Sequence, residues 1–143
     1  MGLVEKLDHV AFAVRDKDAA AQFLTQVLGA REVMDMEWGG FNFASYLLGS
    51  GSMLELVYSG DPNHFINRFI EKHGEGVHHL TIKVRSIDEA VEQARSHGLS
   101  PFDIDKSNPL WKEAYLHPRE ALGTLIQFAE FPEEEWIKIW AGK

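Results

Sequence analysis

The stretch Gly76-Val77-His78-His79-Leu80-Thr81-Ile82-Lys83-Val84-Arg85 resembles an earlier one, Leu7-Asp8-His9-Val10-Ala11-Phe12-Ala13-Val14-Arg15. Aligned with one another, the stretches and the residues that follow them match at a fixed offset of seventy positions (79 minus 9). The five matching pairs are His9 with His79, Val14 with Val84, Arg15 with Arg85, Asp18 with Asp88, and Ala20 with Ala90. Several matches in one register indicate an internal duplication. The sequence therefore predicts two similar modules, each opening with a strand that carries a histidine.

The size and composition of the chain are those of one globular domain. Its 143 residues are 45% hydrophobic and 25% charged, which predicts a single domain over 1–143 whose modules, about 5–60 and 76–130, share one core. A net charge of −8 argues against nucleic acid or an anionic membrane as partner. Apolar runs are too short to span a membrane and Met1–Lys6 lacks the core of a signal peptide, so we expect a cytoplasmic protein.

The first module reads as β-α-β-β-β. Residues Leu7–Val14 alternate between larger and smaller side chains, as in a strand whose larger apolar face packs on a helix. Asp16 or Asp18 can cap that helix, whose apolar positions are spaced i, i+3, i+4, i+7, and Gly29 can end it. Glycine-rich turns then separate three predicted strands, at about 31–37, 41–48 and 53–58.

A connecting helix over about 62–73 leads to the second module, where the pattern begins again. Ser86-Ile87-Asp88-Glu89 has the spacing of a capping box for the second module's helix. The remaining predicted strands are 101–104, 113–117 and 124–129, and 105–112 is predicted to be a loop. A short C-terminal helix is expected over about 132–141.

Two such modules predict an α+β protein whose strands form a curved mixed sheet around a cleft. Strand alternation decides which side chains face that cleft. If helices cover the faces of Val10 and Leu80, then His9 and His79 point inward.

The fourth strand of each module supplies a further polar residue. Glu55 lies between two leucines, and Gln127 lies between Ile126 and Phe128. Because the apolar neighbours pack outward, the two polar side chains point inward. Each module therefore offers one histidine and one Glu or Gln to the cleft.

Two imidazoles, a carboxylate and an amide oxygen around one point describe a site for a divalent first-row metal. The chain has no cysteine, so a metal must rest on such ligands, and those we predict are His9, Glu55, His79 and Gln127. The ion would be cobalt, manganese, nickel, zinc or iron. As a Lewis acid it would polarise a carbonyl group and favour loss of a proton from the adjacent carbon. The other histidines lack this symmetry, and we interpret them as surface residues or as neighbours of the ligands: His64, His73, His78, His97 and His117.

From Lys6 to about Glu130 the sequence resembles the vicinal oxygen chelate (glyoxalase/bleomycin resistance/extradiol dioxygenase) superfamily, and most of all methylmalonyl-CoA epimerases and lactoylglutathione-lyase-like proteins. The resemblance rests on three segments: Leu7-Asp8-His9-Val10-Ala11, Gly74-Glu75-Gly76-Val77-His78-His79-Leu80, and Leu116-His117-Pro118-Arg119-Glu120 with Gly123-Thr124-Leu125. It implies paired β-α-β-β-β modules, a divalent metal in the cleft, and commonly a homodimer. Carried over by position, the implied ligands are the set that strand alternation gives.

The sequence departs from that family at the residues that move protons. Where epimerases usually have a glutamate that binds metal and transfers a proton, this chain has Gln127, whose amide cannot act as a base near neutral pH. Where they often have a glutamine, it has Glu55, and near their second glutamate it has Phe43. We therefore predict Glu55 as the catalytic base and Glu37, beside the Gly39-Gly40 turn, as a second candidate.

The function we expect is that of a metal-dependent isomerase or lyase that removes a proton next to a metal-bound carbonyl. Its substrate would be an acyl-CoA or another small carbonyl compound. One alternative is an iron(II) extradiol-type dioxygenase built on His9, Glu55 and His79. Another is a non-catalytic binding protein of the same fold, favoured by the aromatic residues Trp38, Phe41, Phe43 and Trp111.

Overall fold

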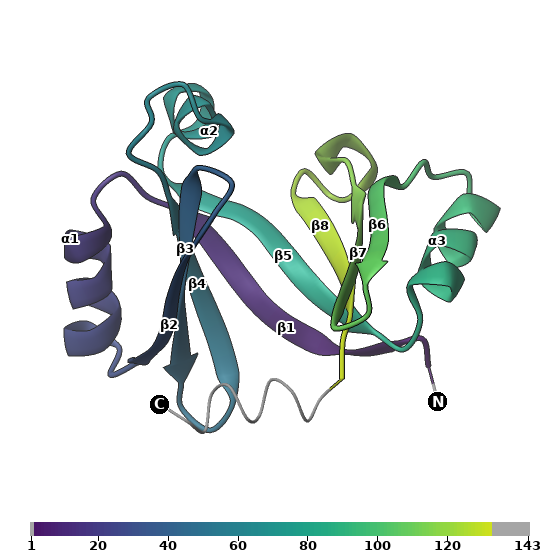
Figure 1. Ribbon diagram of the computed structural model, residues 1–143, viewed down its shortest axis with the longest axis horizontal. Coiled ribbons are helices and arrows are strands. Elements are labelled where there is room, and N and C mark those ends of the chain that lie inside the picture. Colours follow the sequence, from purple (N-terminus) through teal and green to yellow (C-terminus); the bar gives the residue numbers. More distant parts are fainter. Residues whose placement is uncertain (1, 133–143) are drawn as a thin grey trace. The chain divides into compact units, whose positions relative to one another are not determined.

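A computed structural model describes residues 2–132 of the chain, which divides into two compact units (Figure 1). Among the described residues, one unit comprises His9–His78, and the other comprises residues 2–8 together with residues 79–132. The division falls within β1 (Val4–Ala13) and within β5 (Gly76–Val84), at the paired histidines. Each unit thus takes part of both duplicated strands.

In the unit His9–His78 the strand order is β2-β3-β4-β1, with β1 parallel to β4 and the other neighbours antiparallel. After β1 come α1 (Lys17–Gln22), the π-helical turn η1 (Phe23–Val27), β2 (Arg31–Trp38), β3 (Phe41–Leu48), β4 (Ser52–Tyr58) and α2 (Phe65–His73). Strands β2, β3 and β4 begin and end within one residue of the predicted positions, because glycine turns bound them on both sides, whereas β1 begins three residues earlier than predicted.

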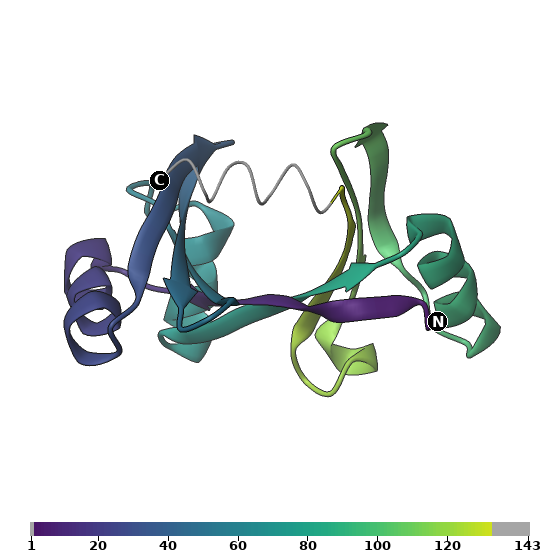
Figure 2. The same cartoon turned by 90° about the horizontal axis from the view of Figure 1, so that it is seen from below.

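The two faces of this sheet pack against different helices (Figures 1 and 2). One face packs against the helical segment that follows β1, through Phe12, Leu24 and Leu56. The other face packs against α2, through Ala11, Val57 and Ile66. The prediction that the larger apolar face of the first strand packs on a helix is confirmed.

The first helix follows its predicted ends but not its predicted packing. Asp16 caps α1 by accepting a backbone N–H of the first turn at 3.1 Å, and Gly29 ends the segment with φ of 72°. Between them the helix widens into η1, where the N–H of Leu28 donates to the carbonyl of Phe23. Phe23 and Val27 are 53% and 68% exposed, so the apolar stripe is only partly buried.

Helix α2 begins at Phe65, later than the expected start at about residue 62. The carboxylate of Asp61 accepts the N–H of Asn63 at 2.9 Å, which holds these residues in a turn before the helix. His64 is the N-cap, because its Nδ1 accepts the N–H of Ile66 at 3.2 Å.

In the other unit the strand order is β5-β8-β7-β6, with β5 parallel to β8 and the remaining pairs antiparallel. Its elements after β5 are α3 (Ile87–Ser96), β6 (Phe102–Asn108), β7 (Trp111–Leu116), the 3-10 turn η2 (Pro118–Glu120) and β8 (Leu125–Glu130). The N-terminal residues join this unit, since the N–H of Arg85 donates to the carbonyl of Leu3 at 2.9 Å.

Helix α3 covers one face of this sheet (Figure 1). Its buried side chains pack against the β7 and β8 residues that lie on that face: Ala114, Leu116, Ile126 and Phe128. The predicted cap of α3 is present on its serine side, where the Ser86 hydroxyl accepts the N–H of Glu89 at 3.2 Å. The Glu89 carboxylate is bonded to Arg85, at 3.0 and 3.1 Å.

The predicted loop 105–112 is wrong, because β6 continues to Asn108 and β7 already begins at Trp111. The residues of β6 are all exposed and its second half is polar, so no apolar alternation predicts that the strand continues beyond Ile104. The expected C-terminal helix over about 132–141 lies almost wholly outside the described residues.

The predicted fold class is confirmed as α+β, with the element order β-α-β-β-β in each half of the sequence. Within residues 2–132, no helix is both long enough and apolar enough to cross a membrane.

Candidate functional site

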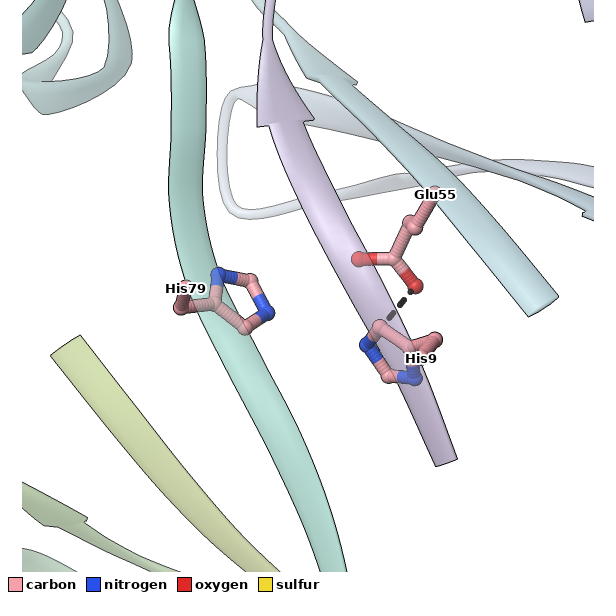
Figure 3. A group of neighbouring side chains, drawn as sticks. All are labelled: His9, Glu55 and His79. Carbon is pink, nitrogen blue, oxygen red and sulfur yellow. Dashed lines mark ion pairs between the residues drawn. The ribbon is translucent and has the colours of Figure 1, made fainter. Parts of the chain in front are cut away.

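His9 and Glu55 form a buried pair on neighbouring strands of one unit. Strands β1 and β4 run parallel with Ala11 opposite Glu55, so His9, two residues earlier, shares the face of the Glu55 side chain. Nε2 of His9 lies 3.4 Å from Oε2 of Glu55, and the two side chains are only 10% and 12% exposed (Figure 3). The pair combines an imidazole nitrogen and a carboxylate oxygen in a place largely shielded from water.

The surroundings of Glu55 explain why its side chain faces this way. Leu56 packs in the cluster beside the first helix, which sends its neighbours Glu55 and Val57 to the opposite face. A buried carboxylate without a partner is costly, and His9 supplies a nearby nitrogen. Imidazole and carboxylate are ligands that suit a divalent first-row metal, so the donors of this pair fit such an ion.

The histidine before His79 has an apolar environment. The ring of His78 lies 4.9 Å from that of Phe69 in an edge-on arrangement and 6.0 Å from that of Phe65. Burial lowers the pKa of His78 to about 4, so the ring is neutral at neutral pH. Figure 3 draws its neighbour His79 on β5, where the second unit begins.

Two of the other histidines cap helical segments. His64 caps α2, and Nδ1 of His117 accepts the N–H of Arg119 at 3.1 Å at the start of η2. Local backbone hydrogen bonds therefore account for both residues without a metal.

In the other unit, Gln127 lies at the centre of a hydrogen-bond network on the face opposite α3. Its Oε1 accepts the Thr81 hydroxyl at 2.6 Å, and its Nε2 donates to the Tyr115 hydroxyl at 3.0 Å and to Oε1 of Glu113 at 3.4 Å. Glu113 also accepts the Tyr115 hydroxyl at 2.9 Å and the indole N–H of Trp111 at 2.7 Å. Thr81 and Gln127 are buried, and both are hydrogen-bonded, as is usual for buried polar groups.

Burial, with the nearby charge of Glu113 as the next cause, raises the pKa of Tyr115 well above its ordinary value. The phenol therefore keeps its proton and donates a hydrogen bond to the Glu113 carboxylate.

Sequence reasoning does not single out Glu113 or Thr81. The signal was available, because Glu113 lies seventy positions after Phe43 (113 minus 43), the offset of the duplication. Phe43 packs with the apolar cluster around Val57, whereas Glu113 places an acid at the matching strand position.

Glu37 lies on the opposite face of its sheet from Glu55. It pairs with Asn42, which shares a face with Ala44, and Ala44 packs in the cluster beside the first helix. Glu37 is exposed. Its predicted part in proton transfer stays a prediction.

A family model and a protein of known function match most of this chain. A family model described as the glyoxalase/bleomycin resistance protein/dioxygenase superfamily matches residues 8–115. The mitochondrial methylmalonyl-CoA epimerase of Mus musculus is 32% identical over 130 residues, which are 87% of this chain and 72% of that protein.

Solved structures give the same result for the fold. The methylmalonyl-CoA epimerase of Mycobacterium tuberculosis matches with a TM-score of 0.80 and 27% identity, over 94% of this chain and 93% of that one. A methylmalonyl-CoA epimerase in complex with methylmalonyl-CoA and NH4+ matches with a TM-score of 0.79 and 22% identity, over 92% and 97%.

Proposed function

Because the chain belongs to the glyoxalase/bleomycin resistance protein/dioxygenase superfamily, we propose that it is an epimerase-like isomerase that requires a divalent metal. It would remove a proton from a carbon next to a carbonyl group and return one to the same carbon. The observation that carries this proposal is the buried pair of His9 and Glu55, a metal-ligand pair that includes a possible base. The similar proteins of Mus musculus and Mycobacterium tuberculosis are methylmalonyl-CoA epimerases, and they support the reaction class.

The proposed metal ligands are His9, Glu55, His79 and Gln127. His9, Glu55 and His79 are side chains of the kinds that can hold a divalent metal ion. Gln127 would contribute Oε1, and an amide oxygen that accepts one hydrogen bond from Thr81 keeps a second lone pair. When bound, a divalent ion supplies Lewis-acid polarisation of a carbonyl group.

Glu55 is our proposed proton acceptor. Its carboxylate lies beside His9 and is shielded from bulk water. Fewer water molecules there compete with the carboxylate for the proton that leaves the substrate carbon. Gln127 cannot take that role, since an amide is not basic near neutral pH. Glu37 is the weaker candidate because it lies on the other face of its sheet.

The substrate class we propose is an acyl-CoA thioester with an acidic hydrogen next to the carbonyl. The name of the mouse relative supports this class, as does the complex of a similar fold with methylmalonyl-CoA. Another small carbonyl compound of the same acidity would be processed by the same chemistry. We also propose that the chain works as a homodimer, which its mass in solution would test.

Deuterium exchange at the substrate carbon tests the function directly. The protein, loaded in turn with Co2+, Mn2+, Ni2+, Zn2+ or Fe2+, would be incubated with methylmalonyl-CoA in D2O, and the label measured by mass spectrometry. We expect rapid labelling with at least one metal and labelling at the buffer rate after chelation. Buffer-rate labelling with every metal would contradict the proposal for this substrate, and oxygen consumption with a catechol and iron would favour the dioxygenase.

A further inference from the structure

The hydrogen bonds around Gln127 have a direction that one residue determines. A threonine or tyrosine hydroxyl can either donate or accept, and an amide offers both an oxygen and a nitrogen. An ionised carboxylate only accepts, and an indole N–H only donates. Among the described residues, three are hydrogen-bonded directly to the Gln127 amide, and of these only Glu113 has a fixed role.

The remaining directions follow from that fixed role. Because Glu113 accepts the N–H of Trp111 and the hydroxyl proton of Tyr115, the oxygen of Tyr115 is left to accept from Gln127. The amide nitrogen therefore faces Tyr115 and Glu113. The amide oxygen faces the other way, where Thr81 donates to it.

A reversed amide would be unfavourable in the same surroundings. Its oxygen would replace the nitrogen that lies 3.4 Å from the Glu113 carboxylate, bringing two acceptors together. The hydrogen bond to the carboxylate would become a repulsion, which is costly for buried polar groups.

The matching place in the other unit is flanked by different residues. There Ala11 and Ser45 flank Glu55 on the neighbouring strands, as Thr81 and Tyr115 flank Gln127. A carboxylate has two equivalent oxygens, so Glu55 offers an oxygen whichever way it turns. An amide offers an oxygen in only one of its two orientations. The network is thus present in the module whose proposed ligand is an amide.

We propose that Glu113 is a positioning residue that fixes the orientation of the Gln127 amide, so that Gln127 presents its oxygen and not its nitrogen to a divalent metal. The inference rests on the proposed function only in taking Gln127 as a ligand. Glu113 acts through Gln127 and makes no contact with the ion.

The test is the affinity of the protein for Mn2+, measured by titration calorimetry on the wild type and on Glu113→Gln. An amide at position 113 keeps the size of the side chain but can donate as well as accept, so the orientation of Gln127 is no longer fixed. We expect Mn2+ to bind about tenfold more weakly, the usual cost of losing an outer partner of a metal ligand. The control is Glu130→Gln. Glu130 is a half-buried acid on the other face of the sheet, where it accepts the N–H of Ile87 at 2.8 Å. This variant should bind Mn2+ like the wild type.

A double-mutant cycle separates positioning from a general structural effect. If Glu113 acts through Gln127, the double variant Glu113→Gln/Gln127→Ala binds Mn2+ no more weakly than Gln127→Ala alone. Additive losses, or an unchanged affinity in Glu113→Gln, would overturn the inference. If Glu113→Gln does not fold, Glu113→Ala removes the same acceptor and should also weaken binding, and an unchanged affinity in that variant would overturn the inference equally.

A second measurement does not depend on metal. In the wild type without metal, we expect the side-chain amide protons of Gln127 to exchange slowly with solvent and to give two separate NMR signals, and in Glu113→Gln to exchange faster. Equal exchange in both proteins would overturn the inference. A wild type that binds no Mn2+ but shows the protected amide would instead refute the metal site and leave the orienting role of Glu113 standing.

Discussion

Glu55 is the one carboxylate among the proposed ligands, so a single side chain would both bind metal and take a proton. Replacing it by glutamine keeps an oxygen beside His9 but removes the base. We expect Glu55→Gln to lower the rate of deuterium exchange by about 100-fold or more, while metal content, measured by mass spectrometry, falls only modestly.

The control for this prediction is Glu37→Gln, which changes an exposed acid on the opposite face of the same sheet. It should exchange deuterium at nearly the wild-type rate. A large loss in Glu37→Gln with none in Glu55→Gln would show that the assignment of the base is reversed.

Replacing Gln127 by the glutamate that epimerases usually carry at this position should destabilise the protein. Gln127→Glu would place a second carboxylate where the amide nitrogen now lies 3.4 Å from Glu113, and two negative charges so close repel each other. We expect a lower melting temperature than the wild type at pH 8. The double variant Glu113→Gln/Gln127→Glu should recover the loss at pH 8, and no recovery would contradict this explanation.

The start of α3 gives a prediction at the level of one element. The hydroxyl of Ser86 accepts the N–H of Glu89, one of the donors that the first helical turn leaves unpaired. We expect Ser86→Ala to lower the free energy of unfolding in urea by about 1 kcal/mol. Ser96→Ala is the control, because that hydroxyl donates to a carbonyl at the end of the helix and should change stability far less.

A hydrogen bond from Tyr58 on β4 to Asp35 on β2 should make the stability of the fold fall at alkaline pH. Burial, followed by the hydrogen bond to Asp35 at 2.8 Å, raises the pKa of Tyr58 from 10.0 to about 12. The folded state therefore holds this proton more tightly than the unfolded state, so the stabilisation is complete below pH 10 and is lost as the pH rises towards 12. In urea unfolding, Tyr58→Phe should be less stable than the wild type at pH 8 and lose less stability between pH 10 and 12. The same decline in both proteins would contradict the assignment.

At the level of elements, the sequence predicts best where apolar alternation and glycine turns coincide. Strand β3 is predicted at its observed bounds for this reason, whereas the polar second half of β6 carries no such pattern. The π-helical turn could not be predicted either, because the apolar spacing of Phe23 and Val27 is that of an ordinary helix. The start of α2 depends on side-chain bonds of Asp61 and His64 that composition alone does not weigh.

At the level of the whole molecule, the duplication predicts most of what the sequence reveals about function. The fixed offset identifies His9 and His79 together, and strand alternation adds Glu55 and Gln127. Within one unit, Glu55 is buried beside His9, and the four-ligand site stays a prediction. The bonds of Gln127 could not be predicted, because they join three strands whose register is fixed only in the folded chain.

Metal content tests the central claim, that the duplicated strands supply one shared metal site. The protein would be purified without added metal and analysed by mass spectrometry, together with His79→Ala and the neighbouring control His78→Ala. We predict close to one equivalent of a divalent first-row ion in the wild type, a similar amount in His78→Ala and little in His79→Ala. A wild type that neither retains nor takes up metal, or a His79→Ala variant that holds as much as the wild type, would contradict the claim.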